Sequence, residues 1–150
     1  MIRRGGSQDV RFLRDLLRHA YYWRTSTLGS ADLPLSRYVD GWGRRGDTAV
    51  VAIDAALPVG AAWYRLFPAE APGFGFVDES TPELTIAVVP SRRGRGFGRE
   101  LMEGLLARAR EDGYQAISLS AEERQVPLYE RYGFERLRKD DGAWTMRAPL

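Results

Sequence analysis

The chain has 150 residues, of which 44% are hydrophobic and 28% charged, and this composition is typical of one globular domain. Its net charge of +2 is too small to indicate bulk attraction to nucleic acid or anionic lipid. The lack of cysteine excludes disulfides, thiolate metal sites and a cysteine nucleophile. Because His19 is the single histidine of the sequence, a metal centre or a serine–histidine triad is also disfavoured. No apolar run reaches the roughly 20 residues of a membrane span. Because residues 1–5 lead into a polar stretch without the apolar core of a signal peptide, we expect one cytoplasmic domain over residues 1–150.

The first part of the chain predicts a short strand followed by two helices. Residues 2–5 favour the strand, and Ser7 and Asp9 are suited to the start of a helix, as N-cap and as partner of the helix dipole. A second helix is expected within residues 35–45, after an aromatic stretch at residues 21–23. The first helix is indicated by apolar residues at helical spacing, namely Val10, Leu13, Leu16, Leu17 and Ala20.

The middle of the chain predicts a hairpin and then a long connection. Residues 48–53 and 59–66 are two strands, joined antiparallel by residues 54–58. Residues 67–82 are rich in proline, glycine and aromatic side chains. A connection of that length in a compact domain is usually either functional or disordered.

The later elements surround a segment rich in arginine and glycine. Residues 84–89 predict a strand that breaks at Pro90, and residues 98–112 predict a helix that ends at Gly113. The order of all the elements indicates an α/β fold of the mixed α+β kind. The remaining elements are a strand at residues 115–120, a short helix at residues 128–132 that stops at Gly133, and a hairpin at residues 136–147 that turns at Asp141 and Gly142.

The segment at residues 91–99 is suited to hold a polyanion. Gly94, Gly96 and Gly98 carry no Cβ and allow a ligand to approach the backbone closely. The helix that follows begins with unpaired N–H groups and the positive end of its dipole. We therefore predict a pyrophosphate site, and the alternative is a structural turn that merely binds buffer anions. The surrounding cations are Arg92, Arg93, Arg95 and Arg99.

Two motifs resemble the GNAT superfamily of acyl-CoA-dependent N-acyltransferases. Arg93-Gly94-Arg95-Gly96-Phe97-Gly98 follows the pattern Arg/Gln-x-x-Gly-x-Gly/Ala and comes after the hydrophobic strand and proline at residues 86–90. Residues 128–134 are similar to that family's Leu-Tyr-Glu-x-x-Gly-Phe. A dinucleotide-binding fold needs an acidic residue about 20 positions further on, where Ser118 and Ser120 stand, and a Walker loop needs Gly-Lys-Ser/Thr. The GNAT resemblance is therefore the stronger one.

The resemblance implies a fold and a cosubstrate. The fold is a central, mostly antiparallel sheet that splays apart at the acyl-CoA site, with helices on both faces. The cosubstrate is acetyl-CoA, bound without a metal, and its pantetheine pairs with the splayed strand at Ile86, Ala87 and Val88. The Val88 N–H then stabilises the developing oxyanion. The pyrophosphate is held by Arg93, Gly94, Arg95, Gly96, Phe97, Gly98 and Arg99.

The resemblance also implies that Tyr129 is the general acid that protonates the thiolate of CoA as it leaves. A phenol with a reference pKa of about 10 keeps its proton at neutral pH and can serve a thiolate with a reference pKa of roughly 8.5. The alternative is that Tyr129 is an aromatic residue of the core. Two departures bear on this: Glu122 stands where the family often has asparagine, and Pro127 is expected to make the helix begin late.

A general base is less clearly marked. Glu83, at the start of the central strand, is the first candidate, acting through a water, and Asp78 and Glu79 follow it. Alternatively, these carboxylates form only a solvated acidic face, or the reaction needs no dedicated base. Together with Glu70 these carboxylates indicate a cationic amine as acceptor. An apolar wall for the acceptor is expected from Trp23, Phe74 and Phe76.

These observations predict an enzyme that transfers an acetyl group from acetyl-CoA directly to a primary amine of a small molecule, peptide or protein. One alternative is a catalytically inactive acyl-CoA-binding sensor or interaction module, motivated by the altered residues 122–127. Another is a nucleic-acid contact through the arginine-rich loop, which the small net charge disfavours. We expect no nucleic-acid, membrane or metal partner, and relatives suggest a homodimer by analogy alone.

Overall fold

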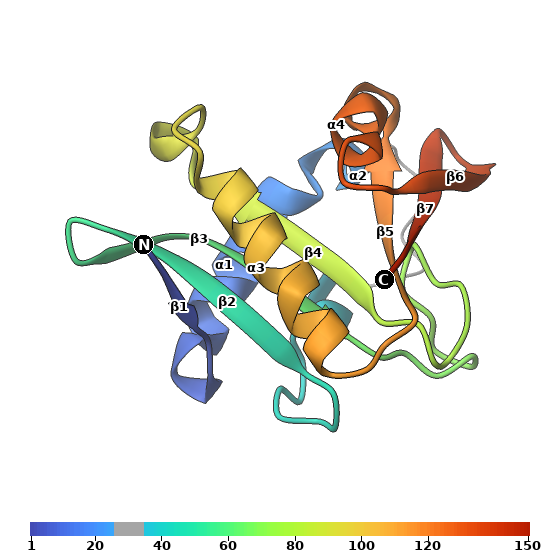
Figure 1. Cartoon of the computed structure of the whole chain (residues 1–150), viewed down its shortest axis with the longest axis horizontal. Coiled ribbons are helices and arrows are strands. Elements are labelled where there is room, and N and C mark those ends of the chain that lie inside the picture. The colour runs from blue at the N-terminus through green and yellow to red at the C-terminus, as the bar shows by residue number, and fades with distance from the viewer. Residues whose placement is uncertain (26–34) are drawn as a thin grey trace.

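The computed structural model of the chain describes residues 1–25 and 35–150. Within these residues, seven strands form one sheet in the order β1-β2-β3-β4-β5-β7-β6 (Figure 1). Neighbouring strands are antiparallel except β4 and β5, which are parallel. The strands are β1 (Ile2–Arg4), β2 (Thr48–Asp54), β3 (Leu57–Arg65), β4 (Glu83–Val88), β5 (Ala116–Glu122), β6 (Glu135–Asp140) and β7 (Ala143–Pro149).

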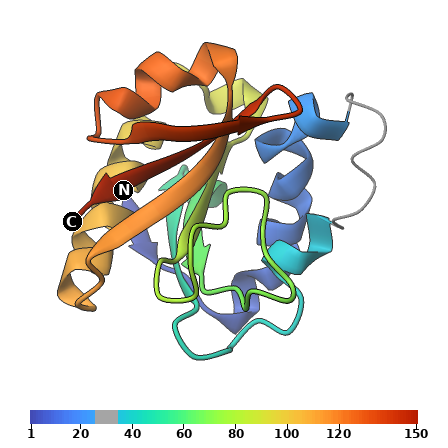
Figure 2. The same cartoon turned by 90° about the vertical axis from the view of Figure 1, so that its right-hand side faces the viewer.

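Helices cover both faces of this sheet, as Figures 1 and 2 show. α1 (Val10–Ala20) packs on one face and is followed by α2 (Tyr22–Thr25), whereas α3 (Phe97–Glu111) and α4 (Val126–Glu130) contribute to the core on the other face. The predicted fold class, a mixed α/β fold with a mostly antiparallel sheet between helices, is therefore confirmed. No helix in the described ranges is long and apolar enough to cross a lipid bilayer.

β4 and β5 are joined at one end only. The register pairs Glu83 with Ser118, and the Ser118 N–H donates to the Pro82 carbonyl at 2.9 Å. Beyond this point the two strands diverge, as expected, and the space between them widens toward α2 and α4 (Figure 1). The divergence leaves the facing edges of both strands available to a ligand.

The connection between β3 and β4 packs across the point where the strands part. The Gly75 N–H donates to Oε2 of Glu83 on β4 at 3.0 Å, and Oγ of Ser118 on β5 donates to the Gly75 carbonyl at 2.8 Å. A Cβ on Gly75 would lie 2.6 Å from the backbone carbon of Leu119, so this approach requires glycine. Residues 66–82, the green loop in front of the sheet in Figure 2, thus fix the closed end of the gap.

The helix predicted within residues 35–45 was wrong. The structure has a single 3₁₀ turn, Leu35–Tyr38, and the following residues form turns. Gly41 has a positive φ of 66°, which ends helical geometry. The buried Arg65 side chain then donates to the Asp40 carbonyl at 2.7 Å, a tertiary contact that helical periodicity cannot show.

The β2–β3 connection is shorter than the predicted residues 54–58. It is a two-residue turn in which Ala55 and Ala56 both have positive φ, 51° and 66°. A two-residue turn of this left-handed kind matches the twist of the strands and is normally built from asparagine and glycine. Ala55 and Ala56 do not carry the sequence signal of such a turn.

Two predictions about helix starts were also wrong. The residue that precedes the first helical turn is Gly6 rather than Ser7, because the Asp9 carboxylate accepts the Gly6 N–H at 2.9 Å. Pro127 does not delay α4, which spans Val126–Glu130 instead of residues 128–132. Proline is tolerated in the first turn of a helix, where its missing N–H would have had no partner.

Buried tyrosines make this fold sensitive to high pH. Burial raises the pKa of Tyr129 to about 12 and raises the pKa of Tyr21 and Tyr38 above the ordinary value of 10. A phenol with a raised folded pKa contributes stability that is complete below its unfolded pKa and is lost as the pH rises through the folded value. We therefore expect cooperative unfolding above pH 10, with tyrosinate absorbance and loss of circular dichroism rising together. Tyrosinate absorbance of these residues in a chain that is still folded would contradict this.

Candidate active site

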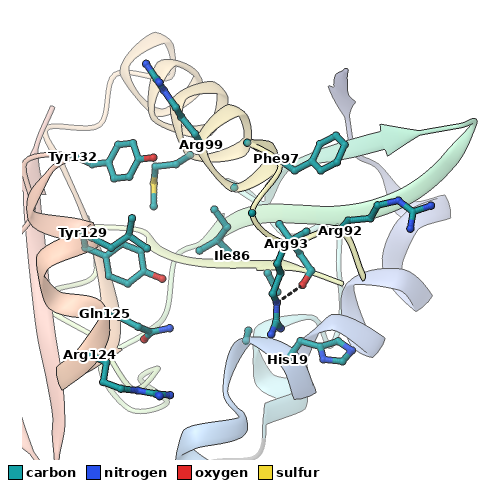
Figure 3. A pocket seen from close by; sticks show the side chains of 18 of the residues that line it. His19, Ile86, Arg92, Arg93, Phe97, Arg99, Arg124, Gln125, Tyr129 and Tyr132 are labelled. Atoms are coloured by element: carbon teal, nitrogen blue, oxygen red, sulfur yellow. Dashed lines mark hydrogen bonds between the residues drawn. The ribbon is translucent and has the colours of Figure 1, made fainter. Parts of the chain in front are cut away.

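A cavity of about 710 Å³ lies between β4 and β5 where they diverge. Ile86, Ala87 and Val88 of β4 and Met102 of α3 form its apolar part. In Figure 3, Tyr129 and its neighbours from the α4 side face the β4 side across the cavity. Residues from the two halves of the sheet, more than 40 positions apart, thus form opposite walls of one site.

The edge of β4 that faces the cavity carries free hydrogen-bonding groups. The Val89 N–H donates to the Val59 carbonyl at 2.8 Å and so faces β3. Because alternate residues of an antiparallel ladder face the same neighbour, the N–H groups of Ile86 and Val88 point away from β3, into the gap. The Val88 carbonyl faces the gap too, where Nε of Arg93 donates to it at 3.1 Å (Figure 3).

A second set of free backbone N–H groups lies a few residues after this edge. After a 3₁₀ turn, Pro90–Arg92, the chain passes through Gly94 and Gly96, with φ of 77° and 87°, into α3. The first helical hydrogen bond of α3 runs from the Glu100 N–H to the Gly96 carbonyl at 3.1 Å. Within the described ranges, no carbonyl or side chain accepts a hydrogen bond from the N–H groups of residues 94–99. They and the helix dipole form a site for an anion.

The cavity has a strong excess of positive charge. Glu122 is the single carboxylate among the described residues that line it, against five arginines. Acidic residues outside the lining hold some of these cations, as Asp54 holds Nε of Arg92 at 2.8 Å. A polyanionic ligand therefore suits this cavity. The five arginines are Arg92, Arg93, Arg99, Arg124 and Arg131.

The residues predicted to bind the cosubstrate lie together with one exception. The Arg95 side chain does not line the cavity, because its guanidinium lies 3.5 Å from the Asp54 carboxylate and 5.9 Å from the centre of the Phe97 ring. The others all line the cavity, namely Ile86, Ala87, Val88, Arg93, Gly94, Gly96, Phe97, Gly98 and Arg99.

Tyr129 lines the wall opposite β4, and Figure 3 shows its hydroxyl pointing into the cavity. Its side chain is 8% exposed, and its ring packs edge-on against Phe134 with centroids 6.1 Å apart. Burial, followed by nearby Tyr132 and Glu122, raises the pKa of Tyr129 to about 12. The phenol therefore keeps its proton across the physiological range and has one to donate.

Glu83 does not line the cavity. Its side chain is 1% exposed, and its carboxylate accepts hydrogen bonds from the Tyr38 hydroxyl and the Gly75 N–H. Two residues further along the same face of β4, the Thr85 hydroxyl bonds to the Tyr21 hydroxyl at 3.0 Å and lines a small extension of the cavity. Glu83 is therefore separated from the cavity by hydroxyl-bearing side chains.

The second candidates for a base lie elsewhere on the connection between β3 and β4. Asp78 accepts hydrogen bonds from the backbone and side chain of Ser80, each at 2.9 Å, and Glu79 accepts the Ala69 N–H at 2.7 Å. Neither lines the cavity. The aromatic residues expected to form an acceptor wall, Trp23, Phe74 and Phe76, pack into the core on the α1 side of the sheet.

Several residues that line the cavity were not predicted. Nη2 of Arg124 donates to the Tyr22 hydroxyl at 2.5 Å and to Oε1 of Glu122 at 2.9 Å, so α2 and the end of β5 are bridged. Gln125 and His19 also line the cavity. The departure at Glu122 was visible in the sequence, but only the tertiary structure brings Tyr22 next to it.

Comparisons with known proteins agree with this geometry. A family model described as "Acetyltransferase (GNAT) family" matches residues 10–134. The "Uncharacterized N-acetyltransferase YjcF" of Bacillus subtilis is 27% identical over 122 residues, which cover 81% of this chain and 79% of that protein. The "N-alpha-acetyltransferase 80" of Mus musculus is 43% identical over 51 residues, which cover 34% of this chain and only 16% of that protein.

Solved structures of low sequence identity share the fold. A ribosomal-protein-alanine N-acetyltransferase from Brucella melitensis superposes with a TM-score of 0.69 at 22% identity, covering 100% of this chain and 99% of that one. A GNAT family acetyltransferase from the same organism, in complex with acetyl-CoA, gives 0.68 at 19% identity, covering 100% and 87%. Because the family match spans well over half of the residues, the chain belongs to the GNAT family of acetyltransferases.

Proposed function

We propose that this chain transfers an acetyl group from acetyl-CoA directly to a primary amine of a small molecule or peptide. The observation that carries the proposal is the pair of free backbone donors at Ile86 and Val88 together with the group at residues 94–99, beside an arginine-rich wall. An extended chain with amides can pair with the strand edge, and a pyrophosphate can bind at the helix start. A chain without cysteine also suits direct transfer, with no acyl-cysteine intermediate.

The proposed roles follow the order of the donors along the chain. Ile86, Ala87 and Val88 hold the pantetheine, and the Val88 N–H donates to the oxygen of the thioester as charge develops on it. Residues 94–99 hold the pyrophosphate through their N–H groups, and Arg93 and Arg99 add their guanidinium groups. Arg95 contributes its backbone, since its side chain is held by Asp54.

Tyr129 is proposed as the general acid. Its buried, protonated hydroxyl faces the cavity from the wall opposite the donors of β4. A proton donated to the sulfur as the C–S bond breaks makes the departing group a neutral thiol.

Glu83 is proposed to take the proton of the amine through a water, with Thr85 between it and the cavity. Glu83→Gln is then expected to lower kcat/KM for the amine by about 10²-fold and to flatten the rising limb of its pH profile. Tyr38→Phe is the matched control, because it removes a contact of the carboxylate and keeps the carboxylate. Equal losses in both variants with an unchanged pH profile would limit Glu83 to anchoring the loop at Gly75.

The proposed function is tested by thiol release from acetyl-CoA with the purified chain and a panel of amines and peptides. We expect release that depends on the amine. Tight binding of CoA in calorimetry without turnover of any amine would instead support the acyl-CoA-binding module, which the altered residues 122–127 motivated.

A further inference from the structure

Polar side chains gather on one face of the two diverging strands. Along β5, Leu119 and its alternate neighbours join the core on the α3 side, whereas Ser118 and Ser120 face the opposite side of the sheet. Along β4, Leu84 likewise joins the α3-side core, and Thr85 faces Tyr21 on the α1 side. The gap therefore has an apolar face toward α3 and a face lined by hydroxyl groups toward α1.

Thr85 and Ser120 lie at the same level on opposite strands. The register pairs Glu83 with Ser118, and two residues further along these parallel strands Thr85 comes opposite Ser120. Both line a small extension of the cavity, with a volume of about 10 Å³, which shares Ile86, Tyr129 and other residues with the main cavity. This volume is about that of one water-sized group.

The Ser120 hydroxyl has no partner in this extension. The residue is 9% exposed, and within the described ranges no group forms a hydrogen bond with its Oγ. The neighbouring hydroxyls are both engaged, Thr85 with Tyr21 at 3.0 Å and Ser118 with the Gly75 carbonyl at 2.8 Å. Buried hydroxyls are rarely left unpaired in folded proteins, so the Ser120 hydroxyl can receive a polar group that enters with the substrates.

The surroundings indicate which group that is. No side chain among the described residues of the extension carries a charge, which favours a neutral partner over an ion. The thioester oxygen already has a proposed donor in the N–H group of Val88. The remaining polar reactant is the amine, which brings N–H donors that a hydroxyl oxygen can accept.

We propose that the Ser120 hydroxyl accepts a hydrogen bond from the acceptor amine and so directs the nitrogen lone pair at the thioester carbon. The inference rests on the proposed acetyl transfer. An extension of this size takes a terminal NH₂ group and has no room for a second carbon substituent on the nitrogen. The size of the extension therefore favours primary over secondary amines.

The proton balance gives Ser120 a purely positioning role. The N–C bond forms as the C–S bond breaks, and an ammonium acceptor loses two protons in all. One proton passes to the proposed base Glu83 and from there to solvent. The other also passes to solvent, and Tyr129, after giving its proton to the sulfur, takes one back from solvent. Ser120 keeps its own proton, so its removal leaves the shape of the pH profile unchanged.

The test compares Ser120→Ala with Ser118→Ala, using n-alkylamines and a lysine peptide, each beside its N-methyl form. Ser120→Ala is expected to lower kcat/KM for the primary amine roughly 5- to 10-fold, with KM for acetyl-CoA changed less than about twofold. Its thermal midpoint should not fall, because no hydrogen bond is lost. Ser118→Ala should lower the midpoint, because its hydroxyl holds Gly75.

The possible results separate the inference about Ser120 from the proposed function. A fully active Ser120→Ala variant, or one that loses affinity for acetyl-CoA by the same factor, overturns this inference alone. The inference is also overturned if the wild-type chain acetylates the N-methyl forms as fast as the primary amines. This measurement needs no variant. A wild-type chain that binds acetyl-CoA but acetylates no amine overturns the proposed function, and the inference about Ser120 with it.

Discussion

Replacing Tyr129 with phenylalanine is expected to lower kcat by about 10²- to 10³-fold, because the sulfur then leaves as an unprotonated thiolate. The fold should tolerate the change, since within the described ranges the hydroxyl forms no hydrogen bond and the ring keeps its packing against Phe134. Calorimetry should show unchanged binding of CoA. Since the pKa of Tyr129 is about 12, its ionisation should not reduce wild-type activity at any pH below the unfolding expected above pH 10.

Tyr132→Phe is the matched control for this variant. Tyr132 lines the same cavity, but in Figure 3 it lies beside Arg99 and not beside the β4 edge. We expect its loss to change kcat only slightly. Equal effects of the two substitutions, or full activity of Tyr129→Phe, would assign Tyr129 to the core and leave the thiolate without a protein acid.

Arg65→Met is expected to cost about 3–5 kcal/mol of stability, the largest effect of any single change considered. Arg65 is 1% exposed, and its guanidinium binds both oxygens of Asp47, at 2.7 and 3.0 Å, and the carbonyl groups of Arg37 and Asp40. Methionine fills the space but leaves a buried carboxylate without its cation. Urea unfolding measures the loss directly.

The double variant Arg65→Met/Asp47→Asn separates charge from packing. Asparagine can still accept the N–H groups of Gly43 and Arg44 that Asp47 accepts, but it carries no charge. Much of the lost stability should return if the unpaired charge is the cause. A single variant that costs less than about 1 kcal/mol would show that water or rearrangement compensates the carboxylate.

The parts of the site that were predicted from the sequence depend on local rules. An apolar run that breaks at a proline, alternate glycines and the start of a helix lie within a few residues of one another, so the site for a polyanion could be read from residues 84–99 alone. The backbone dihedrals of Gly94 and Gly96 show why these glycines are needed, since both have positive φ.

The parts that were missed depend on which segments meet in space. The turn at Ala55 and Ala56 lacks the residues that normally mark it, and the turns after Tyr38 are held by Arg65, which lies on a strand much later in the chain. The sequence marked Ser118 and Ser120 only as residues that stand where a dinucleotide-binding fold needs an acidic one. That they face Thr85 across a gap follows only from the register of β4 and β5.

The divergence of β4 and β5 has a consequence for solubility. It places two unpaired strand edges inside the molecule, and unpaired edges are where chains add to one another and aggregate. The outer edge at β6 is guarded, because that strand is wholly exposed and rich in charge over Glu135–Asp140. The inner edges have no such guard until an extended ligand lies along β4 in the place of a missing strand. We therefore expect binding of the proposed cosubstrate to lower the self-association of the chain.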